Sequence, residues 1–537
     1  MLMFDEYKKL IQEASQQVYA VAKRTELDYA PQLSVRHNNK IWLKREDQQP
    51  VFSYKIRGAY NLIASLSKEE RRLGVITASA GNHAQGVALA ARHLNLKSII
   101  VMPKTTPEIK IDSVKRMNAE VILFGNTYDD SKEHALKLSA EKGMYYVSPY
   151  DHPLVIAGQA TVGVELLEQH PNKPDIIFVP IGGGGLVAGI AAYVKARDSD
   201  IKIIGVEPDE APCMHHAFEA GERIELEQIG IFADGAAVKQ AGEENYRIAK
   251  ELVDEILLVS VDEICAAVKD IFEDTRSIPE PAGALALAGL KQYVTKHQIK
   301  NNELVAIFSG ANVNFDRLRH IAELSALGEN KEALIAIMIP EQPGSFRNLC
   351  HDLGPRLITE FNYRYADDKK AHVFVGVQLK YGAEEKSALM RQLKDRGYDV
   401  VDLSNDDIAK MHIRYMVGGH APQVDNELIY RFEFPERSGA LLHFLNEMGE
   451  NWNISLFSYK PKDWGVSTVM PSHYIELEPE VQVGIFVSIS GFPRGWTCTT
   501  MLIKDPPFNI LSAQVTTSMI TSMTEDTQTH ITISLFN

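Results

Sequence analysis

The sequence predicts a large α/β domain followed by two smaller α+β modules. From about residue 70 to residue 310, short runs of apolar, mostly β-branched residues alternate with longer helical patterns. This alternation is typical of a parallel sheet wrapped by crossover helices. After Leu327, a succession of strand, loop, helix and strand occurs twice, with an offset of 435 − 340 = 95 residues. The chain has 537 residues, which is room for roughly three to four domains.

The composition is that of a globular protein and excludes several classes of function. Hydrophobic residues make up 45% and charged residues 24% of the chain, and the net charge is -15. Because no block is rich in Lys and Arg, we expect no nucleic-acid partner. No run of 18 apolar residues occurs, so the sequence predicts no membrane span. The first residues, MLMFDEYKKLIQEA, predict an amphipathic helix and not a signal peptide, so we expect a cytoplasmic protein.

The cysteines indicate neither a disulfide framework nor a metal site. Cys213, Cys265, Cys350 and Cys498 lie far apart, and no CxxC pair occurs. No histidine lies at the spacing that metal ligands require. We therefore expect no bound metal.

The predicted parallel sheet is built from seven strand candidates. Their residues are apolar on both sides, as a sheet covered on both faces requires. Helical stretches between them include HAQGVALAARHL and GGLVAGIAAYVKAR. The strand candidates are residues 75–79, 98–103, 120–125, 176–182, 201–208, 255–260 and 304–310.

A glycine-rich turn follows the fourth of these strands. Gly182, Gly183, Gly184, Gly185 and Leu186 open the next helix. Four glycines remove every Cβ from the turn, so that backbone N–H groups can converge on an anion at the helix N-terminus. The spacing is neither that of a P-loop nor that of a dinucleotide site. A flexible tight turn is the alternative, but a single phosphate on a small cofactor agrees better with this pattern.

Two further turns of small polar residues follow predicted strands. Ser79, Gly81, Asn82 and His83 come after VITA, and the segment SGAN (309–312) comes after LVAIF. Open α/β sheets bind ligands at the carboxyl ends of their strands. Each turn alone is equally well explained as a helix cap, so only their combination with the glycine turn indicates a ligand site.

The three turns contribute no amine that could react with an aldehyde. Lys55 could contribute one. It lies in PVFSYKIRGAY, flanked by Val51, Phe52, Tyr54 and Ile56. An amine can form a Schiff base with an aldehyde when burial lowers its pKa toward neutrality. By position alone, a helix lysine that extends its amine to solvent is the more common case.

Together these motifs resemble the pyridoxal-phosphate enzymes of the serine/threonine dehydratase and tryptophan-synthase-β class. The repeated C-terminal module resembles the ACT-like regulatory pair of biosynthetic threonine dehydratases (threonine ammonia-lyases). The resemblance implies fold type II, with two open twisted sheets and flanking helices, plus α+β ACT-like modules. The motifs are Lys44 to Asp47, Ser53 to Ala59, Ser79 to His83, Gly182 to Leu186, Glu280 to Gly283 and Ser309 to Asn312.

The resemblance also implies a role for each motif. Lys55 would hold pyridoxal 5'-phosphate and then remove the substrate Cα proton as general base. The glycine turn, Gly182 to Leu186, would bind the cofactor phosphate. Asn82 would bond the 3-oxygen of the ring, and Ser309 would face its nitrogen.

The substrate and the remaining acidic residue are assigned in the same way. Ser79, Ala80, Gly81 and His83 would receive the substrate carboxylate. Glu280 would shape the site without taking part in the chemistry. The reaction implied is deamination of L-threonine to 2-oxobutanoate and ammonia, the first step of isoleucine biosynthesis.

Two alternatives remain at this point. The same cofactor would also serve a serine dehydratase or a racemase, which needs a second acid or base that sequence cannot place. An amino-acid sensor with a decayed catalytic domain would have lost the lysine or the glycine turn, and neither is lost.

The regulatory modules carry the expectation of feedback control. By resemblance, we expect a homotetramer inhibited by isoleucine and relieved by valine. The predicted domains are residues 1–326 (catalytic), 332–405 (first module), 427–480 (second module) and 481–537 (a Ser/Thr-rich tail).

The second module departs from the family pattern after about residue 462. The chain beyond that point is either a different β-rich extension or a sequence not selected to pack, such as a frameshifted one. We therefore expect intact catalysis with impaired or altered isoleucine inhibition, because an effector acts only through two folded states.

Overall fold

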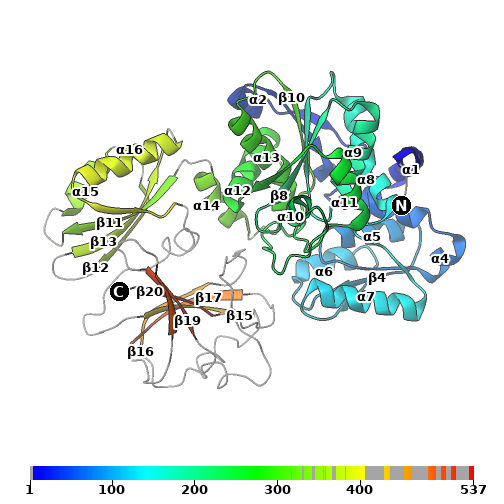
Figure 1. Cartoon of the computed structure of the whole chain (residues 1–537). Coiled ribbons are helices and arrows are strands. Elements are labelled where there is room, and N and C mark those ends of the chain that lie inside the picture. The colour runs from blue at the N-terminus through cyan, green and yellow to red at the C-terminus, as the bar shows by residue number, and fades with distance from the viewer. Residues whose placement is uncertain are drawn as a thin grey trace. The chain divides into compact units, whose positions relative to one another are not determined.

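The computed structural model describes residues 4–404, except 316, 329–331, 341–344, 355, 357, 366–369 and 381, and six strands after residue 404. The chain divides between Ser325 and Ala326 into two compact units. Figure 1 shows the first unit in blue to green and the described part of the second in yellow to red. The two units are described separately.

The first unit contains two open sheets, which confirms the two-sheet architecture that the resemblance implies. The larger sheet has the order β1-β2-β10-β7-β8-β9 and is parallel except where β1 pairs with β2. The smaller sheet has the order β5-β4-β3-β6 and is parallel throughout. The strands are β1 (Leu27–Tyr29), β2 (Lys40–Arg45), β3 (Val75–Ala78), β4 (Ser98–Met102), β5 (Glu120–Leu123), β6 (Tyr145–Tyr146), β7 (Ile176–Pro180), β8 (Lys202–Pro208), β9 (Glu255–Val259) and β10 (Glu303–Phe308).

All seven predicted strands are confirmed as β3, β4, β5, β7, β8, β9 and β10, with ends shifted by one or two residues. The sequence pattern missed β1, β2 and β6. Strand β2 escaped because it ends in Lys44 and Arg45, which are buried despite their charge. Strand β6 contains only two residues, too few for any periodicity.

Helices cover both sheets (Figure 1). They are α1 (Phe4–Gln17), α2 (Pro31–His37), α3 (Lys55–Ala64), α4 (Lys68–Leu73), α5 (Asn82–His93), α6 (Glu108–Lys115), α7 (Tyr128–Lys142), α8 (Pro153–Gln169), α9 (Gly185–Arg197), α10 (Cys213–Ala220), α11 (Glu243–Leu252), α12 (Val261–Thr275), α13 (Pro281–His297) and α14 (Arg317–Gly328).

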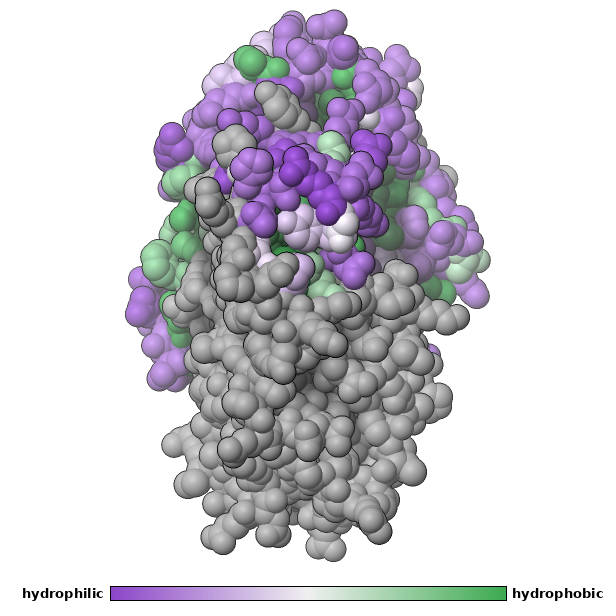
Figure 2. All heavy atoms as spheres, turned by 90° about the vertical axis from the view of Figure 1, so that its left-hand side faces the viewer, coloured by the Kyte–Doolittle hydropathy of each residue, from purple (hydrophilic) through white to green (hydrophobic). Residues whose placement is uncertain are grey.

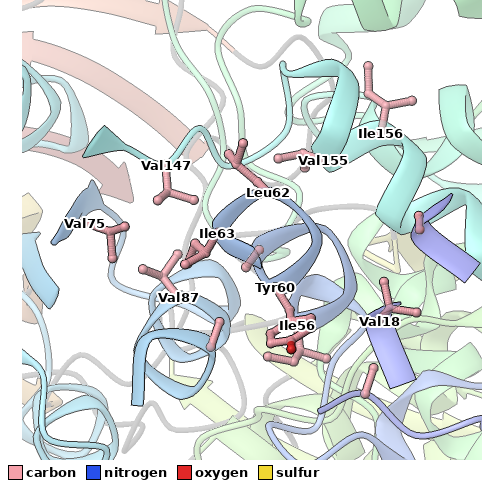
Figure 3. Close-up of a cluster of buried hydrophobic side chains, with 14 of the residues drawn as sticks. Val18, Ile56, Tyr60, Leu62, Ile63, Val75, Val87, Val147, Val155 and Ile156 are labelled. Carbon is pink, nitrogen blue, oxygen red and sulfur yellow. The ribbon is translucent and has the colours of Figure 1, made fainter. Parts of the chain in front are cut away.

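Helix α3 is buried along almost its whole length. Ile56 and Ile63 belong to a cluster that also includes Val87 of α5 and Val155 of α8, and Figure 3 shows these side chains around α3. Gly86 of α5 lies so close to the first turn of α3 that a Cβ there would meet the backbone of Lys55 at 3.2 Å. Each large apolar side chain buried in this way contributes about 1.5–3 kcal/mol. The packing therefore fixes the position of the residue that begins the helix.

Beneath α3 lies a cluster of buried charges. Arg57 donates to Glu46 with two nitrogens, at 2.8 and 2.7 Å, and to Glu165 at 2.5 Å. Lys44 donates to Glu165 at 2.6 Å and to the carbonyl oxygen of Thr25 at 2.7 Å. Burial alone would raise the pKa of Glu46, but the Arg57 guanidinium holds that pKa below its usual range. The cluster joins two cations to two carboxylates, so it carries no net charge.

The first predicted module, in the second unit, is an α+β fold. Its sheet has the order β12-β13-β11-β14, with neighbouring strands antiparallel. The elements are β11 (Glu332–Pro340), α15 (Ser345–Leu353), β12 (Ile358–Tyr365), β13 (Lys370–Gln378), α16 (Gly382–Asp395) and β14 (Asp399–Asp402). This confirms the predicted strand-loop-helix-strand succession, which β13, α16 and β14 extend.

The strands after residue 404 form one antiparallel sheet with the order β16-β17-β15-β20-β19-β18. They are β15 (Leu428–Pro435), β16 (Asn453–Lys460), β17 (Gln482–Ser490), β18 (Cys498–Leu502), β19 (Ile510–Val515) and β20 (Ile531–Phe536). The two predicted strands of the second copy are confirmed as β15 and β16. The helix predicted between them lies outside the described residues.

The two regulatory sheets share part of their topology. Strand β17 pairs with β15 and β16 as β13 pairs with β11 and β12. The register shifts at a corresponding point in both pairs, between Ile358 and Glu360 and between Ile454 and Leu456. Strands β17 to β20 of this sheet lie after residue 480, the predicted end of the second module.

On the face shown in Figure 2, the described residues are mostly hydrophilic, and the hydrophobic ones are scattered. No helix in the described part of the chain is long and apolar enough to cross a membrane.

Candidate active site

Turns from both sheets and the first turn of α3 are joined by hydrogen bonds in the first unit. The backbone N–H of Tyr54 donates to the carbonyl oxygen of Ser309 at 3.3 Å, next to an isolated bridge between Ser53 and Gly310. Asn312 Nδ2 donates to Asn82 Oδ1 at 2.7 Å. The segments containing Lys55, Asn82 and Ser309 are therefore held together, as the sequence predicts for a ligand site.

Lys55 is the first residue of α3, and its side chain is partly buried. Its Nζ donates to the carbonyl oxygen of Pro149 at 3.1 Å. Burial lowers the pKa of Lys55 to about 8, although the charge of Glu280 acts in the opposite direction. Among the described residues no carboxylate forms an ion pair with this amine. The amine therefore loses its proton far more readily than an exposed lysine does.

The predicted surroundings of Lys55 are confirmed in part. Val51 and Ile56 are buried, at 1% and 0% exposure. Phe52, however, is 56% exposed and adopts a positive φ of 54°. This backbone conformation turns the Phe52 ring out to solvent, so it does not contribute to the apolar setting.

The glycine turn lies between the end of β7 and the start of α9. At Gly183 a Cβ would lie 2.3 Å from the ring of Tyr150, and at Gly182 it would lie 3.0 Å from the backbone of Ala236. Gly184 has a φ of 91°, which side-chain-bearing residues rarely adopt. At Gly185, which begins α9, a Cβ would lie 3.0 Å from the backbone of Tyr150. Only glycine fits at these positions, which leaves a cradle of backbone at a helix N-terminus.

Asn82 connects two other parts of the site. Its Nδ2 donates to Glu280 Oε1 at 2.5 Å, while its Oδ1 accepts from Asn312. Burial, with a further contribution from the charge of Asp234, raises the pKa of Glu280 to about 7. The carboxyl group of Glu280 therefore holds its proton at a higher pH than an ordinary glutamate does.

The turn from Ser79 to His83 follows β3. A Cβ at Gly81 would meet no atom within 4 Å, so the turn borders open space. The ring of His83 is 4% exposed, and its Nε2 lies 3.0 Å from the carbonyl oxygen of Val147. Burial, and then the charge of Lys55, lower the pKa of His83 to about 3, so the ring is neutral. Its bond to Val147 holds the ring, which lies close enough to Lys55 for the charge of that amine to act on it.

Ser309 follows β10 and is also buried, at 3% exposure. Its Oγ donates to the carbonyl oxygen of Ala282 at 3.3 Å. This bond orients the hydroxyl toward the first turn of α13. Glu280 caps that helix, and Pro281 is its first residue.

Sequence reasoning missed the segment from Pro149 to Asp151 and residue Asn245. Pro149 accepts from Lys55, and the Tyr150 ring covers Gly183. Asn245 Nδ2 donates to the carbonyl oxygen of Gly183 at 2.7 Å. Neither feature follows a predicted strand or forms a motif, so only the folded arrangement could reveal them.

The residues present fit pyridoxal phosphate. The cradle of glycines lacks any Cβ that would exclude a phosphate, and a readily deprotonated amine lies in the same site. Among the described residues no group of three or more His, Cys, Asp or Glu side chains is arranged to hold a metal ion.

Comparison with known proteins identifies the family. Residues 19–310 match the family described as pyridoxal-phosphate dependent enzymes. Residues 323–413 and 418–470 match the C-terminal regulatory domain of threonine dehydratase.

Individual relatives agree with these matches. The chain is 53% identical over 456 residues to a biosynthetic L-threonine dehydratase of Pasteurella multocida, covering 85% of this chain and 88% of the relative. It is 51% identical over 443 residues to the corresponding protein of Escherichia coli, covering 82% and 86%.

Solved structures show similarity over more than half of the chain. Threonine deaminase isoform 2 from Solanum lycopersicum has a TM-score of 0.58 and 46% identity, covering 60% of this chain and 93% of that one. Maize serine racemase has a TM-score of 0.55 and 32% identity, covering 58% and 95%.

The chain therefore belongs to the pyridoxal-phosphate dependent enzymes. Within them it belongs to the biosynthetic threonine dehydratases, in which this catalytic fold is joined to a C-terminal regulatory domain.

Proposed function

We propose that this chain deaminates L-threonine to 2-oxobutanoate and ammonia, with pyridoxal phosphate held by Lys55. The observation that carries the proposal is the buried Lys55 amine, whose pKa is lowered to about 8 in a site that also contains the glycine cradle. The relatives of similar length are named threonine dehydratases. Serine racemisation has less support, because maize serine racemase is 32% identical and covers 58% of this chain, whereas the threonine dehydratase of Pasteurella multocida is 53% identical over 85% of it.

The cofactor, when bound, supplies an aldehyde that reacts with amines and a ring that delocalises the electrons left on Cα. Lys55 would hold the cofactor, and its amine would be free to act as a base while threonine is bound. As a neutral amine it then takes the proton from Cα. The β-hydroxyl departs as water, and hydrolysis of the released enamine, after tautomerisation to the imine, gives 2-oxobutanoate and ammonia.

The other predicted site residues bind and orient. The backbone N–H groups of Gly182 to Leu186 hold the phosphate at the N-terminus of α9. Asn82 contacts the ring oxygen through its amide, whose position is set by Glu280 and Asn312. The turn formed by Ser79, Ala80, Gly81 and His83 receives the substrate carboxylate through backbone groups and the Ser79 hydroxyl.

Ser309 faces the ring nitrogen in this proposal. A hydroxyl is a far weaker acid-base partner than a carboxylate, so it leaves the nitrogen unprotonated. That limits the electron withdrawal by the ring and favours elimination over transamination. The carboxyl group of Glu280 shapes the site through Asn82.

The regulatory domain supports feedback control by the end product of the pathway. We propose isoleucine as inhibitor, valine as the effector that relieves it, a homotetrameric assembly and a cytoplasmic location. The match to the threonine dehydratase regulatory domain supports the first two assignments.

The test compares two lysines that each begin a helix. Lys55→Ala is expected to abolish threonine-dependent formation of 2-oxobutanoate, because it removes the amine that is proposed to hold the cofactor and to act as base. Lys68→Ala, at the exposed first position of α4, is the matched control and should retain full activity. Full activity in Lys55→Ala would refute the proposed mechanism.

A further inference from the structure

The carbonyl oxygen of Gly183 is held by two donors from the start of α11. The backbone N–H of Gly242 donates to it at 3.1 Å, and Asn245 Nδ2 donates to it at 2.7 Å. Both donors lie outside the glycine turn itself. The orientation of one peptide group in that turn is therefore set from another helix.

That orientation matters because the turn is intrinsically loose. Successive glycines tolerate many backbone conformations, so peptide groups between them can rotate at little cost. In a trans peptide, the C=O and N–H groups of one plane point in opposite directions. Holding the Gly183 oxygen toward α11 thus aims the N–H of Gly184 away from α11. An N–H directed in this way is available to an anion bound at the N-terminus of α9.

The side chain of Asn245 is placed to hold the Gly183 carbonyl group. Its side chain is fully buried, at 0% exposure, and its Oδ1 has no hydrogen-bond partner among the described residues. An unsatisfied buried acceptor weakens a fold, so stability alone does not explain an asparagine here. Its Cβ lies only 3.0 Å from the position that a Cβ of Gly184 would take. The amide therefore lies directly against the turn.

The start of α11 is itself anchored to the rest of the site. Asp151 accepts from the backbone N–H groups of Glu243 and Glu244, at 2.9 and 3.1 Å. Its neighbour Tyr150 covers Gly183, and Pro149 accepts from Lys55. One three-residue segment thus fixes α11, the glycine turn and the lysine with respect to one another.

We infer that Asn245 is a positioning residue for the phosphate-binding turn, acting through the Gly183 carbonyl. The inference rests on the proposed function, since it presupposes that the turn binds the phosphate of pyridoxal phosphate. Asn245 orders the turn before the phosphate arrives, so its amide adds to cofactor affinity without touching the reacting atoms.

The test uses the full chain and two substitutions at this residue. Asn245→Ala removes the donor, and we expect cofactor affinity to fall about tenfold, as the loss of one buried hydrogen bond predicts. Asn245→Asp keeps the shape, replaces the donor by an oxygen and adds a negative charge beside the turn. It should bind the cofactor more weakly still. Affinity is measured by titrating apoprotein with pyridoxal phosphate, and the phosphorus-31 resonance of the bound phosphate should move in both variants.

Asn39→Ala is the matched control. Asn39 is also buried and donates through Nδ2 to the carbonyl oxygens of His37 and Ile299, at the opposite end of β2 from the site. It should lower stability while leaving the phosphorus-31 resonance and cofactor affinity as in the wild type. Wild-type affinity and resonance in both Asn245 variants would overturn the inference, as would an equal loss in Asn39→Ala. A wild-type chain that binds no pyridoxal phosphate would instead refute the proposed function.

Discussion

At the scale of single residues, the chemistry depends on the protonation of Lys55. Its amine donates to the Pro149 carbonyl oxygen, and burial lowers its pKa to about 8. The nearby carboxyl group of Glu280 opposes that shift when ionised, and its own pKa is raised to about 7 by burial and by Asp234. The ring of His83 remains neutral, since its pKa lies near 3. Lys55 and Glu280 are thus the groups of the site that titrate close to neutral pH.

The attachment of pyridoxal phosphate to the apoprotein should report the pKa of Lys55. Only the neutral amine attacks an aldehyde, so the rate should rise with pH and level off above about 8, well below the 10.5 of an ordinary lysine. Stopped-flow absorbance at constant cofactor concentration measures this rate. Glu280→Gln removes the charge that supports the ammonium form, so its midpoint should move to lower pH. A wild-type rate still climbing steeply at pH 10 would contradict this assignment.

At the scale of elements, α3 presents Lys55 because two kinds of contact fix the helix. Apolar packing joins it to α5 and α8 (Figure 3), and Arg57 pairs with Glu46 and with Glu165 of α8. The sequence predicted the seven parallel strands and the turns after them, since apolar runs and glycines are local signals. It did not predict Tyr150 or Asn245, because their contacts join segments far apart in the chain. Phe52 shows the same limit, since only the folded backbone reveals that its ring turns outward.

Arg57→Met should destabilise the fold strongly. The substitution keeps an apolar stem but leaves Glu46 and Glu165 buried with one cation in place of two, which typically costs about 3–5 kcal/mol. Lys97→Met breaks the exposed pair with Glu120, whose atoms are 3.3 Å apart, and should cost less than about 1 kcal/mol. Chemical denaturation of the apoprotein measures both free energies of unfolding. Equal effects of the two substitutions would show that the charge cluster does not hold α3.

At the scale of the whole molecule, the chain combines a catalytic unit with regulatory modules that differ from one another. The first module has a core of its own, including Ile335, Leu349 and Val375. In the sheet that follows, residues 461–481 join β16 to β17, whereas residues 366–369 join the corresponding strands of the first module. The sequence repeat predicted the shared strands, but it could not predict β17, which follows a segment unlike anything in the first copy.

The response to isoleucine should therefore depart from that of a regulated dehydratase. Because feedback requires two states with different effector affinity, an altered second module should weaken inhibition and leave threonine turnover intact. Steady-state rates with and without isoleucine, and with valine added, measure this response. Sigmoidal inhibition by isoleucine that valine fully relieves would contradict the expectation.

The central claim is that Lys55 holds the cofactor, and borohydride reduction of the cofactor-loaded protein tests it most directly. Reduction makes the bond between amine and cofactor permanent, and trypsin does not cleave after a modified lysine. The account predicts one labelled tryptic peptide, residues 46–57, carrying the reduced cofactor on Lys55. A label on any other lysine, or none at all, would contradict the account.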